Sequence, residues 1–356
     1  MYIKSLLVVG SGYYTLGDSR DFGTILSSVI QWQKDNDYNF KNFKVSFLLK
    51  DKKKLSYKKN LVLRHISFFK YKINFEFVLL SEITHNYDAC IIATPEQYHY
   101  FYASKFVKKK VPIICVKPFG KNLIEYKNAN KLTEMYKSNI YIDFHKRYDK
   151  ANLNIGNVIS KNLNLNYQII INYSQNYYVP KIRFLKWSYK SNPFQFLAPH
   201  YLDLINLWFK PKSFNLEAYA IKNSINKKGY EAISALINFK IGGGGGKNSV
   251  IVSINCNWFE PLNYFQKSRQ NIEIITNKFH MYSDQANRGF TKLDSSGYLE
   301  PNDYFTFFYK KNFSGYGYES FKNFFDKIFL NKEVTLVKLN EYAFVGKVLD
   351  RVNKKI

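Results

Sequence analysis

The chain has 356 residues, of which 46% are hydrophobic, and 53 Lys and Arg against 27 Asp and Glu give a formal net charge of +26. This length exceeds what one ordinary hydrophobic core organises and predicts two domains. No apolar run approaches the roughly 20 residues of a membrane-spanning helix. The start of the chain lacks a small-residue cleavage site, so we expect no secretory signal and a cytoplasmic protein.

The distribution of basic residues and the cysteine count argue against several classes of partner and site. Lysines are spread over almost every segment, and Asn, Ile, Tyr and Phe are abundant, as an AT-rich coding sequence would give. We favour this compositional drift over attraction of an anionic substrate or nucleic-acid binding, and expect neither nucleic acid nor a membrane as partner. Three scattered cysteines argue against a disulfide framework and against a metal site.

The first 147 residues alternate short apolar runs with amphipathic ones. A helix is predicted over 22–34, and helical periodicity recurs over 95–110 and 122–138. The predicted strands cover 3–10, 43–49, 74–80, 89–95, 112–118 and 139–145. Because these strands lack polar alternation and are joined by helices, they predict a doubly wound parallel α/β sheet, the Rossmann arrangement that binds dinucleotides, over residues 1–147.

The remaining residues, 148–356, predict an α+β domain. A helix over 148–162 precedes long strands with better alternation, and two more helices are expected near 318–329 and 338–350. The predicted strands cover 167–175, 215–225, 231–241, 248–259 and 271–282. They indicate a mostly antiparallel sheet with one covered face. The "GGGGG" at 242–246 is not followed by the Lys-Ser or Lys-Thr of a phosphate loop, so we interpret it as a hairpin connection.

The first strand runs into a glycine turn, "GSGYYTLG" at 10–17. Gly10 and Gly12 match the opening of the dinucleotide fingerprint, in which the backbone approaches pyrophosphate closely. Thr15 stands where the third glycine is expected. We predict cofactor contacts from Gly10, Gly12, Tyr13 and Thr15.

The cofactor's second half is predicted at the ends of later strands. Asp51 would hold ribose hydroxyls, but its lysine neighbours would suit a 2′-phosphate, so NAD and NADP both remain open with a slight preference for NAD. Thr94, Pro95 and His99 follow the fourth strand, and Lys117 ends the fifth. Ligands of open α/β sheets sit outside these carboxyl ends, so Lys117 is expected to reach a substrate oxygen and stabilise developing charge.

Three motifs carry a resemblance to a known family: the stretch from 91 to 122 with T-P-x-x-x-H and K-P, "HKRYD" at 145–149, and "PHYLDLINLW" at 199–208. In this order they resemble the Gfo/Idh/MocA oxidoreductases, especially the inositol-dehydrogenase-like members. The resemblance implies NAD(P)-dependent oxidation of a hydroxyl group, or reduction of a keto group, on a sugar, cyclitol or nucleotide-sugar. It also implies a homodimer or homotetramer formed through the open sheet of the second domain.

The resemblance also assigns residue roles. Lys117 contacts both cofactor and substrate, and His200 is the general acid/base, a task that suits a pKa near neutrality. Asp203 lies one helical turn after His200 and orients it or binds substrate. The expected substrate-binding residues are Arg147, His145, Asp203, Tyr201 and Trp187, the last in a loop with Arg183 and Lys186.

This chain departs from the family pattern at two carboxylates. Val116 replaces the glutamate before the motif lysine, and Phe196 replaces an aspartate that many members carry four residues before the histidine. These losses leave a second hypothesis open, in which the protein is a non-catalytic relative that binds a dinucleotide or sugar as a sensor or scaffold.

Overall fold

The computed structural model forms two compact units, which are described separately. The first contains Met1–Tyr148 and Tyr304–Ala343, and the second contains Asp149–Asp303 and Phe344–Ile356. The described residues are 3–36, 42–83, 86–178, 180, 187, 190–223, 229–241, 247–261, 268–285, 291–293, 299–301 and 304–356. The structure differs from the predicted domain division in one respect, since 304–343 pack with the amino-terminal unit. The glycine run at 242–246, Arg183 and Lys186 lie outside the described residues.

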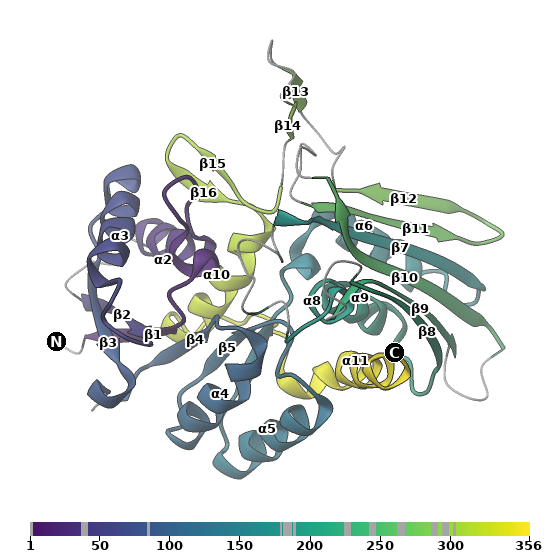
Figure 1. The fold of residues 1–356 in the computed structure, drawn as a ribbon, viewed down its shortest axis with the longest axis horizontal. Coiled ribbons are helices and arrows are strands. Elements are labelled where there is room, and N and C mark those ends of the chain that lie inside the picture. Colours follow the sequence, from purple (N-terminus) through teal and green to yellow (C-terminus); the bar gives the residue numbers. More distant parts are fainter. Residues whose placement is uncertain are drawn as a thin grey trace. The chain divides into compact units, whose positions relative to one another are not determined.

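The first unit is built on a six-stranded sheet in the order β3-β2-β1-β4-β5-β6 (Figure 1). Its strands are β1 (Lys4–Val9), β2 (Phe43–Leu49), β3 (Asn74–Leu79), β4 (Ala89–Ile92), β5 (Ile113–Val116) and β6 (Ile140–Asp143). Every neighbouring pair is parallel. The central strand β1 is covered on both faces, because Leu6, Leu7 and Val8 have no exposed surface. The predicted doubly wound sheet is confirmed.

Helices connect these strands. They are α1 (Tyr13–Leu16), α2 (Thr24–Asp35), α3 (Leu55–Phe69), α4 (His99–Lys108) and α5 (Leu123–Tyr136), with 3-10 turns η2 (Leu80–Glu82), η3 (Glu96–Tyr98) and η4 (His145–Tyr148). α5 begins at an Asn122 cap whose side chain accepts the Glu125 backbone N–H. Because all strands of this sheet are parallel, the carboxyl ends of β1, β4, β5 and β6 lie on the same side of the unit, which we call the carboxyl edge of the sheet.

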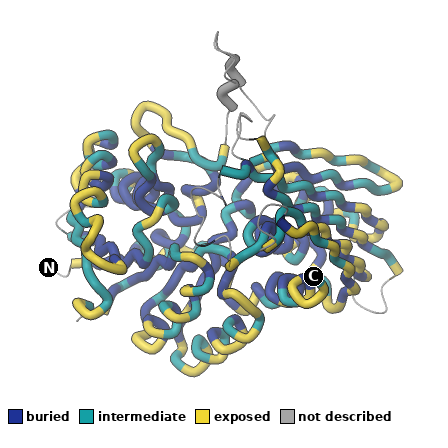
Figure 2. The backbone as a smooth tube through the Cα atoms, viewed as in Figure 1, coloured by how far each residue is buried: buried dark blue, intermediate teal, exposed yellow. Residues whose placement is uncertain are grey.

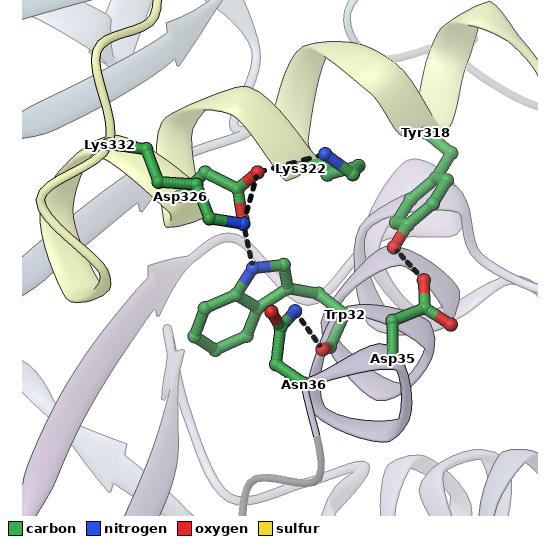
Figure 3. Close-up of polar contacts among 7 residues, drawn as sticks. All are labelled: Trp32, Asp35, Asn36, Tyr318, Lys322, Asp326 and Lys332. Atoms are coloured by element: carbon green, nitrogen blue, oxygen red, sulfur yellow. Dashed lines mark hydrogen bonds and ion pairs between the residues drawn. The ribbon is translucent and has the colours of Figure 1, made fainter.

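The carboxyl-terminal helix α10 (Tyr316–Phe329) belongs to this unit and packs on α2 (Figure 3). The buried Trp32 ring lies 5.4 Å from Phe325 and 5.5 Å from Phe329. Its indole N–H donates to Asp326 at 2.9 Å, and Asp326 also pairs with Lys322 at 2.8 Å. The hairpin of β15 (Phe307–Tyr309) and β16 (Asn312–Ser314) precedes α10, and η6 (Leu339–Tyr342) follows it.

The second unit contains a mixed, mostly antiparallel sheet in the order β12-β11-β7-β10-β9-β8. Its strands are β7 (Tyr167–Asn176), β8 (Asn215–Lys222), β9 (Tyr230–Lys240), β10 (Ser249–Glu260), β11 (Ser268–Ile275) and β12 (His280–Asp284). Only the β7–β10 pair is parallel among these six strands. A separate small pair joins β13 (Thr291–Leu293) to β14 (Leu299–Pro301).

The second sheet is covered on one face. Along β9, Ile233 and Ile237 are buried while Leu236 between them is exposed, an alternation visible as blue and yellow bands in Figure 2. The helices of this unit are α6 (Lys150–Ser160), α8 (Pro193–Leu197), α9 (Pro199–Phe209) and α11 (Ala343–Lys355). Within the described ranges no helix has the length and apolar character to cross a bilayer.

Candidate functional site

The glycine turn leaves room above its backbone. A side chain at Gly10, whose φ is +105°, would lie 2.3 Å from the Ala93 carbonyl oxygen, so only glycine fits. A Cβ at Gly12 would meet no atom within 4 Å. The buried hydroxyl of Thr94 has no hydrogen-bond partner, and its methyl group lies near Gly10. Open space above Gly12 fits a dinucleotide, whose pyrophosphate needs close backbone approach.

The residues from Tyr13 to Gly23 fold back as a small loop. Tyr13 donates a 2.5 Å hydrogen bond to Asp21, and Thr15 is fully buried. His65 anchors the end of the loop, because its Nε2 accepts the Gly23 N–H at 3.1 Å and its Nδ1 lies 2.8 Å from the Leu61 carbonyl oxygen. Since Nε2 accepts, the imidazole is neutral with its hydrogen on Nδ1.

The end of β2 presents Asp51 among lysines. The Asp51 carboxylate accepts the Lys53 backbone N–H at 3.0 Å, and Lys58 donates to the Ser11 hydroxyl at 2.6 Å. Burial lowers the pKa of Lys58, and the charge of Asp51 acts against that shift. Lys58, which the sequence pattern did not single out, therefore links α3 directly to the glycine turn.

His99 bridges two backbone segments at the same edge of the sheet. Its Nε2 lies 2.7 Å from the Thr94 carbonyl oxygen and its Nδ1 lies 2.8 Å from that of Pro118. The ring is 1% exposed. This arrangement positions the turn that carries Lys117 against the one that carries Thr94 and the exposed Pro95.

Lys117 follows β5 directly, and its peptide bond to Pro118 is cis. The ammonium of Lys117 acts electrostatically on His145, at the start of η4 after β6, and lowers the pKa of that imidazole. Burial is the larger cause of that lowering. Lys117 and His145, two residues predicted from separate motifs, are therefore electrostatic neighbours.

A buried carboxylate, Asp143, ends β6 beside this pair. Its Oδ2 accepts the Tyr14 hydroxyl at 3.1 Å and lies 3.6 Å from His145 Nδ1. Burial, and then the charge of Asp143, hold the pKa of Tyr14 well above its usual value. Neither Asp143 nor Tyr14 was predicted as a site residue, although a polar residue that ends an apolar strand was the signal that identified Asp51.

The rest of the "HKRYD" segment packs against the carboxyl-terminal part of the same unit. Arg147 lies 3.6 Å from the Glu341 carboxylate, and the ammonium of the buried Lys146 lies 5.8 Å from the Tyr316 ring centroid. The His145 ring lies 4.6 Å from that of Phe305. This segment is therefore held on one side by aromatic rings.

The second unit carries the other predicted residues on or near α9. His200, Tyr201 and Asp203 are 2%, 4% and 0% exposed, and His200 and Asp203 are one helical turn apart. Trp187 packs edge-on against Phe196 at 4.8 Å, and Phe196 in turn lies 5.8 Å from Trp258. The residue that replaces the family's aspartate thus fills an aromatic cluster.

No group of three or more His, Cys, Asp or Glu side chains suited to a metal occurs in the part of the chain that the structure describes. The three cysteines are buried free thiols. The roles assigned to individual residues from the motifs stay predictions.

Comparison with known proteins identifies the fold. No family model and no curated protein sequence matches the chain. Among solved structures, scyllo-inositol dehydrogenase from Lactobacillus casei with bound NAD(H) and scyllo-inositol is similar with a TM-score of 0.70 and 12% identity, over 99% of this chain and 97% of that one. Myo-inositol 2-dehydrogenase from Lactobacillus plantarum gives 0.69 and 13% over 99% and 97%.

A probable dehydrogenase from Thermotoga maritima is similar with a TM-score of 0.66 and 12% identity, over 99% of this chain and 96% of that one. These identities are low, so the likeness concerns the fold. The resemblance predicted from three short motifs is confirmed at that level: the chain has the fold of inositol dehydrogenases and related oxidoreductases of the Gfo/Idh/MocA type.

Proposed function

We propose that the protein is an NAD-dependent oxidoreductase that transfers hydride between nicotinamide and a CH–OH carbon of a sugar or cyclitol. The observation that carries this proposal is the open space above Gly12, at the carboxyl ends of the strands, where Lys117 follows β5. The three similar solved structures described above are dehydrogenases, one of them with NAD(H) and scyllo-inositol bound. A nucleotide-sugar is a further candidate substrate of the same class.

NAD is the proposed cofactor because Asp51 follows β2, where a carboxylate pairs with ribose hydroxyls. The bound nicotinamide would accept or return the hydride. Gly10, Gly12 and Thr94 would hold the dinucleotide, with Tyr13, Thr15, Pro95 and His99 shaping the surrounding turns. The lysines next to Asp51 make NADP the competitor to compare.

The proposed chemistry needs an acid/base group and a positive charge. Lys117 donates a hydrogen bond to the substrate oxygen and stabilises the negative charge that develops on it. His200 takes the hydroxyl proton as the C–H hydrogen leaves with its electron pair, so the alcohol becomes a carbonyl. Asp203 orients the imidazole, while His145, Arg147, Tyr201 and Trp187 contact the substrate.

The second candidate is a non-catalytic sensor, and the aromatic packing of Phe196 favours it. That ring fills the space between Trp187 and Trp258 where a carboxylate is absent. Such a protein would bind the dinucleotide or a sugar without catalysing a reaction.

An absorbance assay that follows reduced nicotinamide in the presence of each member of a panel of cyclitols and sugars distinguishes the two candidate functions. We expect turnover by the natural protein and a loss of ~10²-fold or more in kcat for Lys117→Ala and for His200→Ala, with NAD affinity retained in the second variant. Tyr57→Ala, at an exposed position on α3, is the control and should leave kcat unchanged. NAD binding without turnover on any member of the panel would favour the sensor.

We further propose that a second copy of the chain covers the open face of the second sheet. This open face, defined by Tyr219, Leu236 and Ile251, exposes large apolar side chains on three adjacent strands. An asparagine ladder continues it, since Asn255 donates to Asn172 at 2.9 Å and Asn172 donates to Asn271 at 3.1 Å.

A further inference from the structure

The missing glutamate and the buried Asp143 lie at the same level of the parallel sheet. In the pairing of β5 with β6, Val116 is the direct partner of Asp143. Paired residues of neighbouring strands point to the same face, and the strands are about 4.8 Å apart. A carboxylate absent from one strand is therefore present on the next strand and on the same face.

Asp143 is a buried carboxyl group of the first unit. Its side chain is 2% exposed, Oδ2 accepts the Tyr14 hydroxyl, and Oδ1 has no hydrogen-bond partner. A buried carboxylate oxygen without a partner is costly, so its retention calls for an explanation. Tyr14 comes from the glycine turn, so Asp143 also connects that turn to the end of β6.

Beside the Tyr14 hydroxyl, Asp143 also faces the imidazole of His145. Burial lowers the pKa of this imidazole, Asp143 raises it, and the charges of Lys146 and Lys117 lower it further. The Tyr316 ring packs on it from α10 at 5.7 Å. A carboxylate 3.6 Å from Nδ1 attracts a hydrogen at that nitrogen, which makes Nε2 the accepting nitrogen of the neutral ring.

We infer that Asp143 takes the place of the glutamate lost at Val116: it is a positioning residue that keeps the hydrogen of the neutral His145 imidazole on Nδ1, so that Nε2 accepts a hydrogen bond from a substrate hydroxyl beside Lys117. This inference rests on the proposed function for its last step only. The position of the hydrogen is a property of the ligand-free protein. The loss of the family glutamate is then a relocation of the charge by one strand.

The first test is nitrogen-detected NMR of the imidazoles without cofactor. The chain has six histidines, so loss of one signal in His145→Gln assigns it. Above the His145 pKa we expect the Nδ1–H form, and Asp143→Asn should lower that pKa. Asp88→Asn is the control: it alters a carboxylate that accepts from Ser5 at the amino-terminal ends of β1 and β4, and it should leave the His145 pKa unchanged. A His145 that carries its hydrogen on Nε2 in the natural protein would overturn the inference, whether or not any variant folds.

The second test transfers the carboxylate from position 143 on β6 to position 116 on β5. Asp143→Asn should lower kcat/KM about tenfold to a hundredfold, the effect of one hydrogen bond to a charged group. Val116→Glu in the Asp143→Asn background should restore both the His145 pKa and most of the activity. A folded Asp143→Asn variant with normal activity and an unshifted His145 pKa contradicts the inference. Absence of turnover in the natural protein would instead contradict the proposed function, while the NMR result still decides the role of Asp143.

Discussion

His65 shows how one neutral imidazole supports the region that would hold the cofactor. It accepts the Gly23 N–H at the end of the loop that follows the glycine turn, and burial lowers its pKa to about 4. Protonation would place a second donor against that N–H. The unfolded chain, in contrast, takes up the proton near pH 6.5.

The stability of the first unit should therefore fall as pH decreases. Above about pH 6.5 both states of His65 are neutral, and between there and about pH 4 only the unfolded state gains a proton. The shift costs up to about 3 kcal/mol of unfolding free energy. His65→Gln keeps an acceptor but does not titrate, so in urea unfolding at about pH 7 and about pH 4.5 it should lose less stability than the natural protein. Equal losses in the two proteins would exclude this role for His65.

Among individual residues, the sequence predicted those whose position next to an apolar run marks them as strand ends. Gly10, Gly12 and Lys117 stand at the ends of apolar runs and lie at the sheet edge in the structure. Asp143 also ends an apolar strand and was not singled out, and its hydrogen bond with Tyr14, 129 residues away, follows from no local pattern.

The α2–α10 contact is the clearest case in which an element contributes far from its place in the sequence. Trp32 and Asp326 are 294 residues apart and share a buried hydrogen bond. Burial alone would raise the pKa of Asp326, but its bonds to Lys322 and Trp32 hold it below its usual value. Tyr318 adds a 2.7 Å bond from α10 to Asp35 on α2 (Figure 3).

Removal of the Asp326 carboxylate should loosen α10 from the first unit. We expect Asp326→Ala to lower the unfolding free energy by about 2 kcal/mol, because it deletes charge-assisted hydrogen bonds and leaves the indole N–H buried without its acceptor. Asp350→Ala, which removes an i,i+4 surface pair with Lys354 on α11, is the control and should cost under about 0.5 kcal/mol. Thermal unfolding followed by tryptophan fluorescence measures both, and equal effects would show that the buried cluster adds nothing.

Sequence periodicity located α2, α6 and α10 within a few residues of their ends, but it did not predict α3 (Leu55–Phe69). It did not predict that 304–343 pack with the first unit. The periodicity of α10 predicts which of its faces is apolar, but it does not predict that this face packs on α2. Nor did it predict the parallel pairing of β7 with β10, because strand pairing depends on contacts about 80 residues apart.

At the scale of the whole molecule, the exposed apolar residues of the open face predict self-association. In sedimentation experiments we expect a dimer or tetramer, and the double substitution Leu236→Lys with Ile251→Lys should give monomers, because like charges would face each other across the contact. Ile124→Lys, at an exposed apolar position on α5, should leave the assembly intact. A natural protein that sediments as a monomer would refute the proposed interface.

Whether the glycine turn holds a dinucleotide is tested most directly by the affinity for NAD of the natural protein and of Gly12→Val. A side chain at Gly12 meets open space, so the variant should keep its thermal midpoint, whereas one at Gly10 would collide with backbone. By calorimetry we expect the natural protein to bind NAD more tightly than NADP, and Gly12→Val to bind NAD at least ~10²-fold more weakly because its methyl groups take the place of pyrophosphate. Equal NAD affinity in the two folded proteins, or no NAD binding by the natural protein, would contradict the account.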